Sequence, residues 1–160
     1  MAMISGFPTY GLAGARIGFA VGNPEIIAML KALKSNLDYG MFLPVQKAAV
    51  AALTGPQDCV ETTRRAYESR RNVLVDGLGR AGWKIDRPKA TMFVWARIPE
   101  PYRSSEAFTL DLLRRAGVLV TPGAAFGPSG EGHVRFALVQ DEDTMREAVC
   151  SVAASGILGG

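Results

Sequence analysis

The protein has 160 residues, of which 48% are apolar and 21% are charged, and its 18 Lys and Arg against 15 Asp and Glu give a formal net charge of +3. This length and composition predict one globular domain, or one domain with an appendage, that buries a core of its own. They exclude intrinsic disorder, which requires few large apolar residues and a high net charge. No apolar run approaches the roughly 20 residues of a membrane-spanning helix, so no membrane partner is expected.

The two cysteines and the single histidine do not form a predicted metal site. Cys59 and Cys150 have no CxxC spacing and no histidine at ligand spacing, which favours two reduced thiols over a disulfide or a zinc site. His133 is predicted to be a structural imidazole. The first residues have neither the basic start nor the long apolar stretch of a signal peptide, so we expect a cytoplasmic protein.

The charge pattern gives little support to nucleic-acid binding. The sequence pI is about 9.1, but the basic residues are interleaved with acidic ones. In the long helix expected from Pro56, the arginines at 64, 65, 70 and 71 lie off the apolar stripe and alternate with Glu61 and Glu68. This arrangement predicts a solvated helix face, and no nucleic-acid partner is expected.

The first half of the chain predicts one strand followed by helices. Residues 15–21 form an apolar run that is expected to be a buried strand. A helix over residues 24–33 follows, because Asn23 can cap it, Pro24 suits its first position and Glu25 favours the positive end of its dipole. Further helices are expected over residues 45–53 and from Pro56 to about residue 81.

The second half predicts an α+β arrangement. Short β-rich segments are expected at residues 83–86, 92–98, 118–121 and 133–139. Helices are expected over residues 105–116 and after an Asp141 cap. Because these elements alternate without an internal repeat, they predict a small sheet covered by helices on one face.

One glycine-rich segment has a specific pattern, TYGLAGARIGFAVG at residues 9–22. It resembles the stretch that follows the cofactor lysine in class I and II aminotransferases, the fold-type I enzymes that use pyridoxal phosphate. The resemblance implies that Arg16 binds the cofactor phosphate and that Ser5 matches a phosphate-binding serine. A guanidinium fork suits phosphate oxygens. Taken alone, without the rest of the resemblance, the segment would favour a loop with one surface charge.

The resemblance continues through most of the chain. The segments KATMFVW at residues 89–95, GVLVTPGAAFG at 117–127 and VRFAL at 134–138 are similar to the small domain of that family. Arg135 falls on the arginine that binds the α-carboxylate of the substrate. An arginine within an apolar strand is costly to bury unless an anion pairs with it. Residue types alone leave two candidates for that anion, a carboxylate ligand or an internal Asp or Glu.

Two departures from the family pattern qualify the expected activity. Pro8 stands eight residues before Arg16, where the family has the lysine that holds the cofactor as a Schiff base, and proline has no side-chain amine. The part of the family's large domain that precedes this lysine has no counterpart in the chain. The resemblance therefore implies a remnant of the large domain at residues 1–43, interdomain helices at 44–81 and the C-terminal small domain at 82–160.

Two functions of different classes follow. The chain is expected to be part of an aminotransferase that moves an amino group between an amino acid and a 2-oxo acid, commonly as a homodimer, and to be inactive by itself; related lyases share the fold. The alternative is a non-catalytic small domain for packing, dimerisation or carboxylate binding. A remnant of a larger sheet should expose Ile17, Phe19 and Val21.

Overall fold

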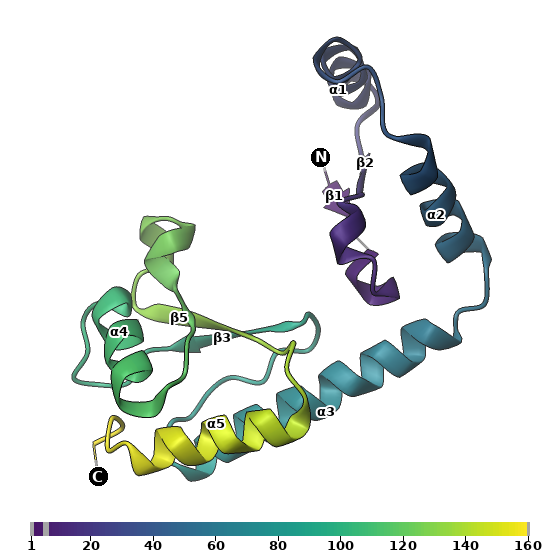
Figure 1. Ribbon diagram of the computed structural model, residues 1–160. Helices are drawn as coiled ribbons and strands as arrows, with labels where there is room; N and C mark the ends of the chain where they lie inside the picture. The colour runs from purple at the N-terminus through teal and green to yellow at the C-terminus, as the bar shows by residue number, and fades with distance from the viewer. Residues whose placement is uncertain (1, 5–6, 160) are drawn as a thin grey trace. The chain divides into compact units, whose positions relative to one another are not determined.

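The computed structural model describes residues 2–4 and 7–159, and the chain divides into two compact units at residues 65 and 66 (Figure 1). The helix α3, Asp58–Arg80, begins in the first unit and continues into the second.

The first unit combines a two-stranded ribbon with helices. Strand β1, Ala2–Ile4, pairs antiparallel with β2, Phe19–Val21. Between them lie two 3-10 helices, η1 at Phe7–Tyr10 and η2 at Ala13–Ala15. Helices α1, Pro24–Leu37, and α2, Leu43–Thr54, follow.

The strand predicted over residues 15–21 was wrong in its first half. Ala15 belongs to η2, and Arg16 adopts a left-handed backbone conformation with φ of 51°. A residue in that conformation cannot continue an extended strand. Strand β2 therefore begins only at Phe19.

The start of α1 follows from local chemistry. The Asn23 side chain accepts hydrogen bonds from the backbone N–H groups of Glu25, at 2.8 Å, and Ile26, at 3.4 Å. Pro24 occupies the first helical turn, as expected. The helix extends four residues beyond the predicted end at residue 33. Lys34 and Asp38 form an ion pair at its C-terminal end.

The first unit has almost no buried core. Among its described side chains, Ala49 alone is buried. Phe19 and Val21 are exposed as predicted, whereas Ile17 is half-buried. Large exposed apolar side chains also lie along both helices, at Ile26, Met29, Leu33, Leu37, Leu43, Val50 and Leu53. This unit therefore presents apolar surface that a self-contained domain would normally bury.

The second unit contains a three-stranded antiparallel sheet. Its order is β3, Phe93–Arg97, then β5, His133–Ala137, then β4, Thr121–Pro122. Helix α4, Ser105–Ala116, and helix α5, Glu142–Ala154, complete the unit, together with the 3-10 helices η3, Gly123–Phe126, and η4, Pro128–Gly130. In Figure 1, α5 runs alongside the second-unit part of α3.

Two predicted strands differ from the structure. Residues 83–86 form no strand, because Trp83 is used to close the end of α3: its backbone N–H donates to the Leu78 carbonyl and its indole N–H donates to the Arg97 carbonyl at 2.8 Å. Residues 118–120 are also outside the sheet. The strand predicted at 118–121 is the two-residue β4, which pairs with β5 at Arg135 and Val134.

The core of the second unit lies on one face of the sheet. Val94, Val134 and Leu138 are fully buried against side chains from α3, α4 and α5. Phe108 of α4 is at the centre, with its ring edge-on to Trp83 at 5.2 Å between centroids and to Tyr102 at 5.0 Å. The unit is thus the expected α+β arrangement of a small antiparallel sheet with helices. None of the described helices is both long and apolar enough to cross a bilayer.

Candidate functional site

Arg135 lies on the sheet face opposite the core. Side chains alternate between the two faces of a strand, and Val134 and Phe136 of β5 occupy the buried face. Arg135 therefore projects from the other face, where Trp95 of β3 and Thr121 of β4 are its direct cross-strand neighbours. The burial pattern of β3 alternates in the same way.

The guanidinium of Arg135 contacts aromatic rings, and no acidic side chain among residues 2–4 and 7–159 pairs with it. Its central carbon lies 4.3 Å from the ring centroid of Phe93 and 4.5 Å from that of Phe126. Within the described part of the chain, it forms no ion pair or hydrogen bond, and its Nε is buried without a partner. The internal salt bridge that the sequence left open is therefore not formed. The cation is available to an external anion, for which a carboxylate has matching geometry.

Two further rings continue this aromatic surface. Trp95 lies edge-on to Phe126, with 5.7 Å between ring centroids, and it stacks on His133 at 5.5 Å with an interplanar angle of 16°. The sequence placed no function on these side chains. The alternation of polar and apolar residues in β5 could have assigned His133 and Arg135 to one face, but not their contact with Phe126.

The loop that carries Phe126 is held by backbone contact. A Cβ atom on Gly123 would lie 1.9 Å from the Gly130 carbonyl oxygen, and one on Gly130 would lie 2.1 Å from the Gly123 oxygen. Only glycine permits this approach. The loop is also fixed to α4: Ser105 Oγ accepts from the Ala124 N–H, and Glu131 accepts from the Ser105 N–H at 2.6 Å. Phe126 is thereby placed on a rigid support.

Arg16 lies on the turn between η2 and β2. Its side chain is exposed, and one terminal nitrogen donates to the Ala13 carbonyl at 3.3 Å. Within the described residues it has no acidic partner. Pro8 is in η1, and Ser5 lies outside the described residues. Arg16 belongs to the first unit and Arg135 to the second.

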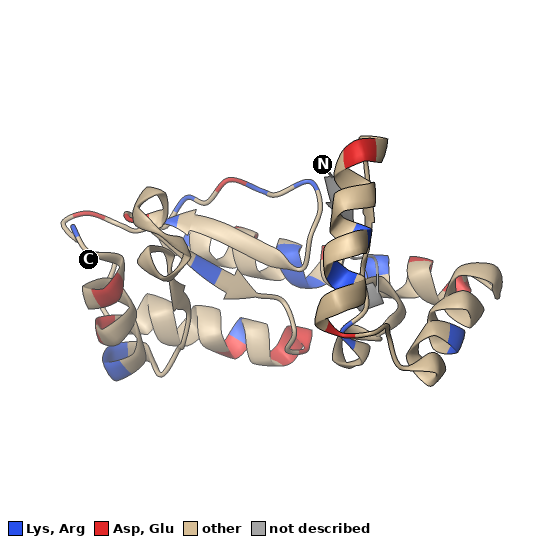
Figure 2. Cartoon of the chain, turned by 90° about the horizontal axis from the view of Figure 1, so that it is seen from above, with Lys and Arg blue, Asp and Glu red and all other residues tan. Residues whose placement is uncertain are grey.

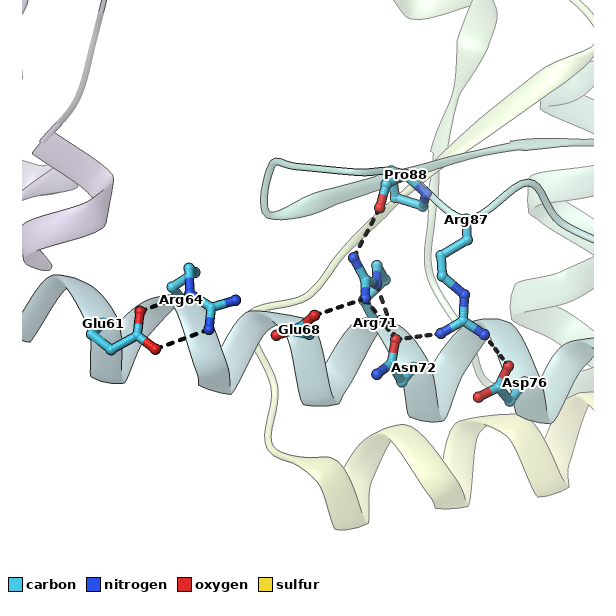
Figure 3. A network of polar contacts seen from close by, with 8 residues as sticks. All are labelled: Glu61, Arg64, Glu68, Arg71, Asn72, Asp76, Arg87 and Pro88. Atoms are coloured by element: carbon cyan, nitrogen blue, oxygen red, sulfur yellow. Dashed lines mark hydrogen bonds and ion pairs between the residues drawn. The ribbon is translucent and has the colours of Figure 1, made fainter.

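The arginines of α3 are only partly the solvated face that the sequence predicted. Arg64 and Arg65 bind Glu61, and these contacts lower the pKa of its carboxyl to about 2. Figure 3 shows the pair of Arg64 with Glu61. Arg71 is largely buried instead, and it donates to the Pro88 carbonyl and to Asn72.

Arg70 likewise serves the tertiary structure and donates to the Leu138 carbonyl at 3.1 Å. The predicted solvated face is wrong at residues 70 and 71. A long arginine side chain that lies outside the apolar stripe of a helix can still reach the backbone of another segment, as these two do. Figure 2 shows Lys and Arg interspersed with Asp and Glu over the chain. Among the described residues, no three His, Cys, Asp or Glu side chains are placed to hold a metal ion.

Comparison with known proteins explains these features. The model of the aminotransferase class I and II family matches residues 9–152. The chain belongs to this family. It is 49% identical over 148 residues to glutamate-pyruvate aminotransferase AlaC of Escherichia coli. The matched region covers 91% of this chain and 36% of that protein. It is 44% identical to an LL-diaminopimelate aminotransferase of Moorella thermoacetica, over 88% of this chain and 36% of that protein.

Two solved structures, one of them an aminotransferase, have the same fold. An aminotransferase from Staphylococcus aureus superposes with a TM-score of 0.89 at 32% identity, covering 99% of this chain and 42% of that one. BacF from Bacillus subtilis superposes with a TM-score of 0.86 at 37% identity, covering 95% of this chain and 39% of that one. The chain thus spans somewhat more than a third of the length of the aminotransferases that it matches.

Full-length aminotransferases of this family use pyridoxal phosphate, and the residues of this chain fit that cofactor only in part. Arg16, exposed and without an acidic partner among the described residues, suits the phosphate. Residue 8, where the resemblance would put the lysine that holds the cofactor aldehyde, is proline, and no lysine precedes Lys31 in this sequence.

Proposed function

We propose that these residues form part of a pyridoxal-phosphate-dependent aminotransferase that moves an amino group between an amino acid and a 2-oxo acid, and that the chain is inactive by itself. The observation that carries the proposal is the cation of Arg135. It is held on the sheet face opposite the core with no acidic partner among the described residues, in a chain that belongs to the aminotransferase family. In the full enzyme the cofactor supplies the carbonyl and the electron sink for amino-group transfer.

Two arginines receive separate roles in this proposal. Arg135 binds the α-carboxylate that amino acids and 2-oxo acids share, and it thereby fixes the orientation of the substrate. Arg16, together with Ser5, binds the cofactor phosphate. Both roles use the planar donor fork of a guanidinium, which matches the oxygens of a carboxylate or a phosphate.

The proposed domain division follows the exposed surface of the first unit. Residues 1–43 would belong to a large domain whose remaining sheet covers Phe19 and Val21, and residues 44–81 would form the interdomain helices before the small domain at 82–160. The support is the near absence of buried side chains in the first unit beside the complete core of the second. In the isolated chain, the same exposed surface favours a homodimer.

The proposed inactivity is tested with cofactor and borohydride. The chain is incubated with pyridoxal phosphate, reduced, digested and mapped by mass spectrometry. We expect only scattered, substoichiometric labelling of surface lysines and no transamination of alanine or glutamate. E. coli AlaC serves as the positive control. A stoichiometric adduct at one residue, accompanied by turnover, would refute the proposed inactivity.

A non-catalytic carboxylate-binding module is the second candidate. It is favoured by the second unit, which contains both a core of its own and Arg135. Titration with 2-oxoglutarate and with sulfate, followed by NMR, tests it. We expect 2-oxoglutarate to shift the amide signals of β5 in the parent chain and to leave them unchanged in Arg135→Ala. Unchanged spectra of the parent chain would contradict a carboxylate site in this chain.

A further inference from the structure

The guanidinium of Arg135 contacts two aromatic rings. The two rings that it contacts come from different elements: Phe93 begins β3, and Phe126 ends η3. Their centroids lie at nearly equal distances of 4.3 Å and 4.5 Å from the guanidinium carbon. Both distances are within the range of strong cation–π contact.

These contacts restrict how the guanidinium can present its hydrogen-bond donors. A guanidinium has five N–H groups in one plane. Nε of Arg135 is buried and has no partner among the described residues, so its N–H is not presented to solvent. The two terminal nitrogens carry the remaining donors. Unlike Nε, neither of them is a buried atom that lacks a hydrogen-bond partner. A carboxylate can therefore approach only at the end of the fork, where two parallel N–H groups meet its two oxygens.

Phe126 can hold this orientation because it is itself supported. Trp95 packs edge-on against its ring. The preceding turn is tied by the close contact of Gly123 with Gly130. Phe93 is placed by strand pairing, two residues from Trp95 on the same face. A flexible arginine side chain would otherwise lose much rotamer freedom when it binds a ligand, and rigid rings remove part of that cost in advance.

We propose that Phe93 and Phe126 are positioning residues that hold the guanidinium of Arg135 with its two terminal nitrogens outward for end-on binding of a substrate carboxylate. The inference rests on the proposed function, because it assumes that Arg135 binds that carboxylate. The rings themselves do not touch the carboxylate. They determine its direction of approach and reduce the entropy lost on binding.

The experiment compares Phe126→Leu with Phe126→Tyr in the 160-residue chain. Leucine keeps the apolar volume and removes the ring, whereas tyrosine keeps the ring. Phe126 is 51% exposed, so neither change disturbs the core. The readouts are the Nε–Hε signal of Arg135, assigned by its loss in Arg135→Lys, and the affinity for 2-oxoglutarate.

In the parent chain and in Phe126→Tyr, we expect a ring-current-shifted Arg135 signal and slow rotation about the Cζ–Nε bond. In Phe126→Leu, the shift should decrease, the rotation should accelerate and the affinity should fall about two- to tenfold. Phe93→Leu should act in the same direction, with folding checked on the amide spectrum.

Different outcomes contradict the positioning role of the two rings and the carboxylate-binding role of Arg135. An Arg135 signal that is the same in Phe126→Leu as in the parent chain would overturn the positioning role, whether or not the ligand binds. Unaltered affinity in Phe126→Leu would also overturn it. No binding of 2-oxoglutarate by the parent chain, with a ring-shifted Arg135 signal, would contradict the carboxylate-binding role that the proposed function gives to Arg135.

Discussion

The packing of α3 on α5 can be tested with two glycines of one helix. A Cβ atom added to Gly77 would lie 2.7 Å from Cγ1 and 3.0 Å from Cγ2 of Val149, whereas one added to Gly79 would meet nothing within 4 Å. Both positions are in α3. Gly77→Ala and Gly79→Ala therefore change the helix propensity equally, but only Gly77→Ala brings a Cβ atom into collision with Val149.

The expected free energies follow from these two contributions. Replacing a helical glycine by alanine stabilises a protein by about 0.5–1 kcal/mol, so Gly79→Ala should raise the free energy of unfolding by that amount. At Gly77, the stiff, β-branched Val149 must move by several tenths of an ångström or more. Overpacking of this kind costs about 1–3 kcal/mol. Gly77→Ala should therefore be about 1–3 kcal/mol less stable than Gly79→Ala.

The assay is urea unfolding followed by tryptophan fluorescence, with circular dichroism as the second probe. Both tryptophans, the buried Trp83 and the exposed Trp95, belong to the second unit. Val149→Ala provides the control, because it removes the colliding atoms. The free energy of unfolding of the double variant Gly77→Ala, Val149→Ala should be higher than the value predicted by adding the effects of the two single changes. Equal stabilisation by both glycine substitutions, or strict additivity with Val149→Ala, would refute the close helix contact.

Three further predictions concern the core, the pH dependence and the exposed surface. Phe108→Ala should lower the free energy of unfolding of the second unit by about 3–5 kcal/mol in the same urea assay, because it empties a fully buried site between two rings; a loss below 1 kcal/mol would contradict that packing. Hydrogen bonds from the backbone N–H groups of Gly132 and Ser105 lower the pKa of Glu131, so its contribution to stability is present above pH 4.5 and is lost as pH falls through the lower folded value. The difference in urea midpoint between the parent chain and Glu131→Gln should accordingly shrink from pH 6 to pH 3, and a constant difference would disprove this origin. Met29→Lys with Leu33→Lys should reduce self-association in light scattering, since both side chains are exposed on α1; Leu119→Lys, an exposed site in the second unit, is the control and should have little effect.

The starts of α1 and α5 were predictable because their causes are local, whereas α2 begins two residues before the predicted residue 45 and α3 two residues after the predicted Pro56. The Asn23 cap acts on residues two and three positions later, and Asp141 accepts from the Thr144 N–H at 2.8 Å. The sequence alone also identified the family and the α+β class, since both depend on the order of residues and on periodicity. Strand limits were less predictable: residues 83–86 have strand-like composition, but a strand also needs a partner with free backbone groups.

The environment of Arg135 was decided by tertiary structure. Its position within an apolar strand indicated that an anion was needed, and the sequence left open whether that anion was internal. Phe93 lies 42 residues before it, and only the pairing of β3 with β5 brings that ring to the guanidinium. Phe126 arrives through a turn that depends on the backbone contact of two glycines. The sequence by itself thus singled out Arg135 as the candidate cation, because charge and motif are properties of the residue. The fold decided what surrounds that cation, because those contacts join residues that are distant along the chain.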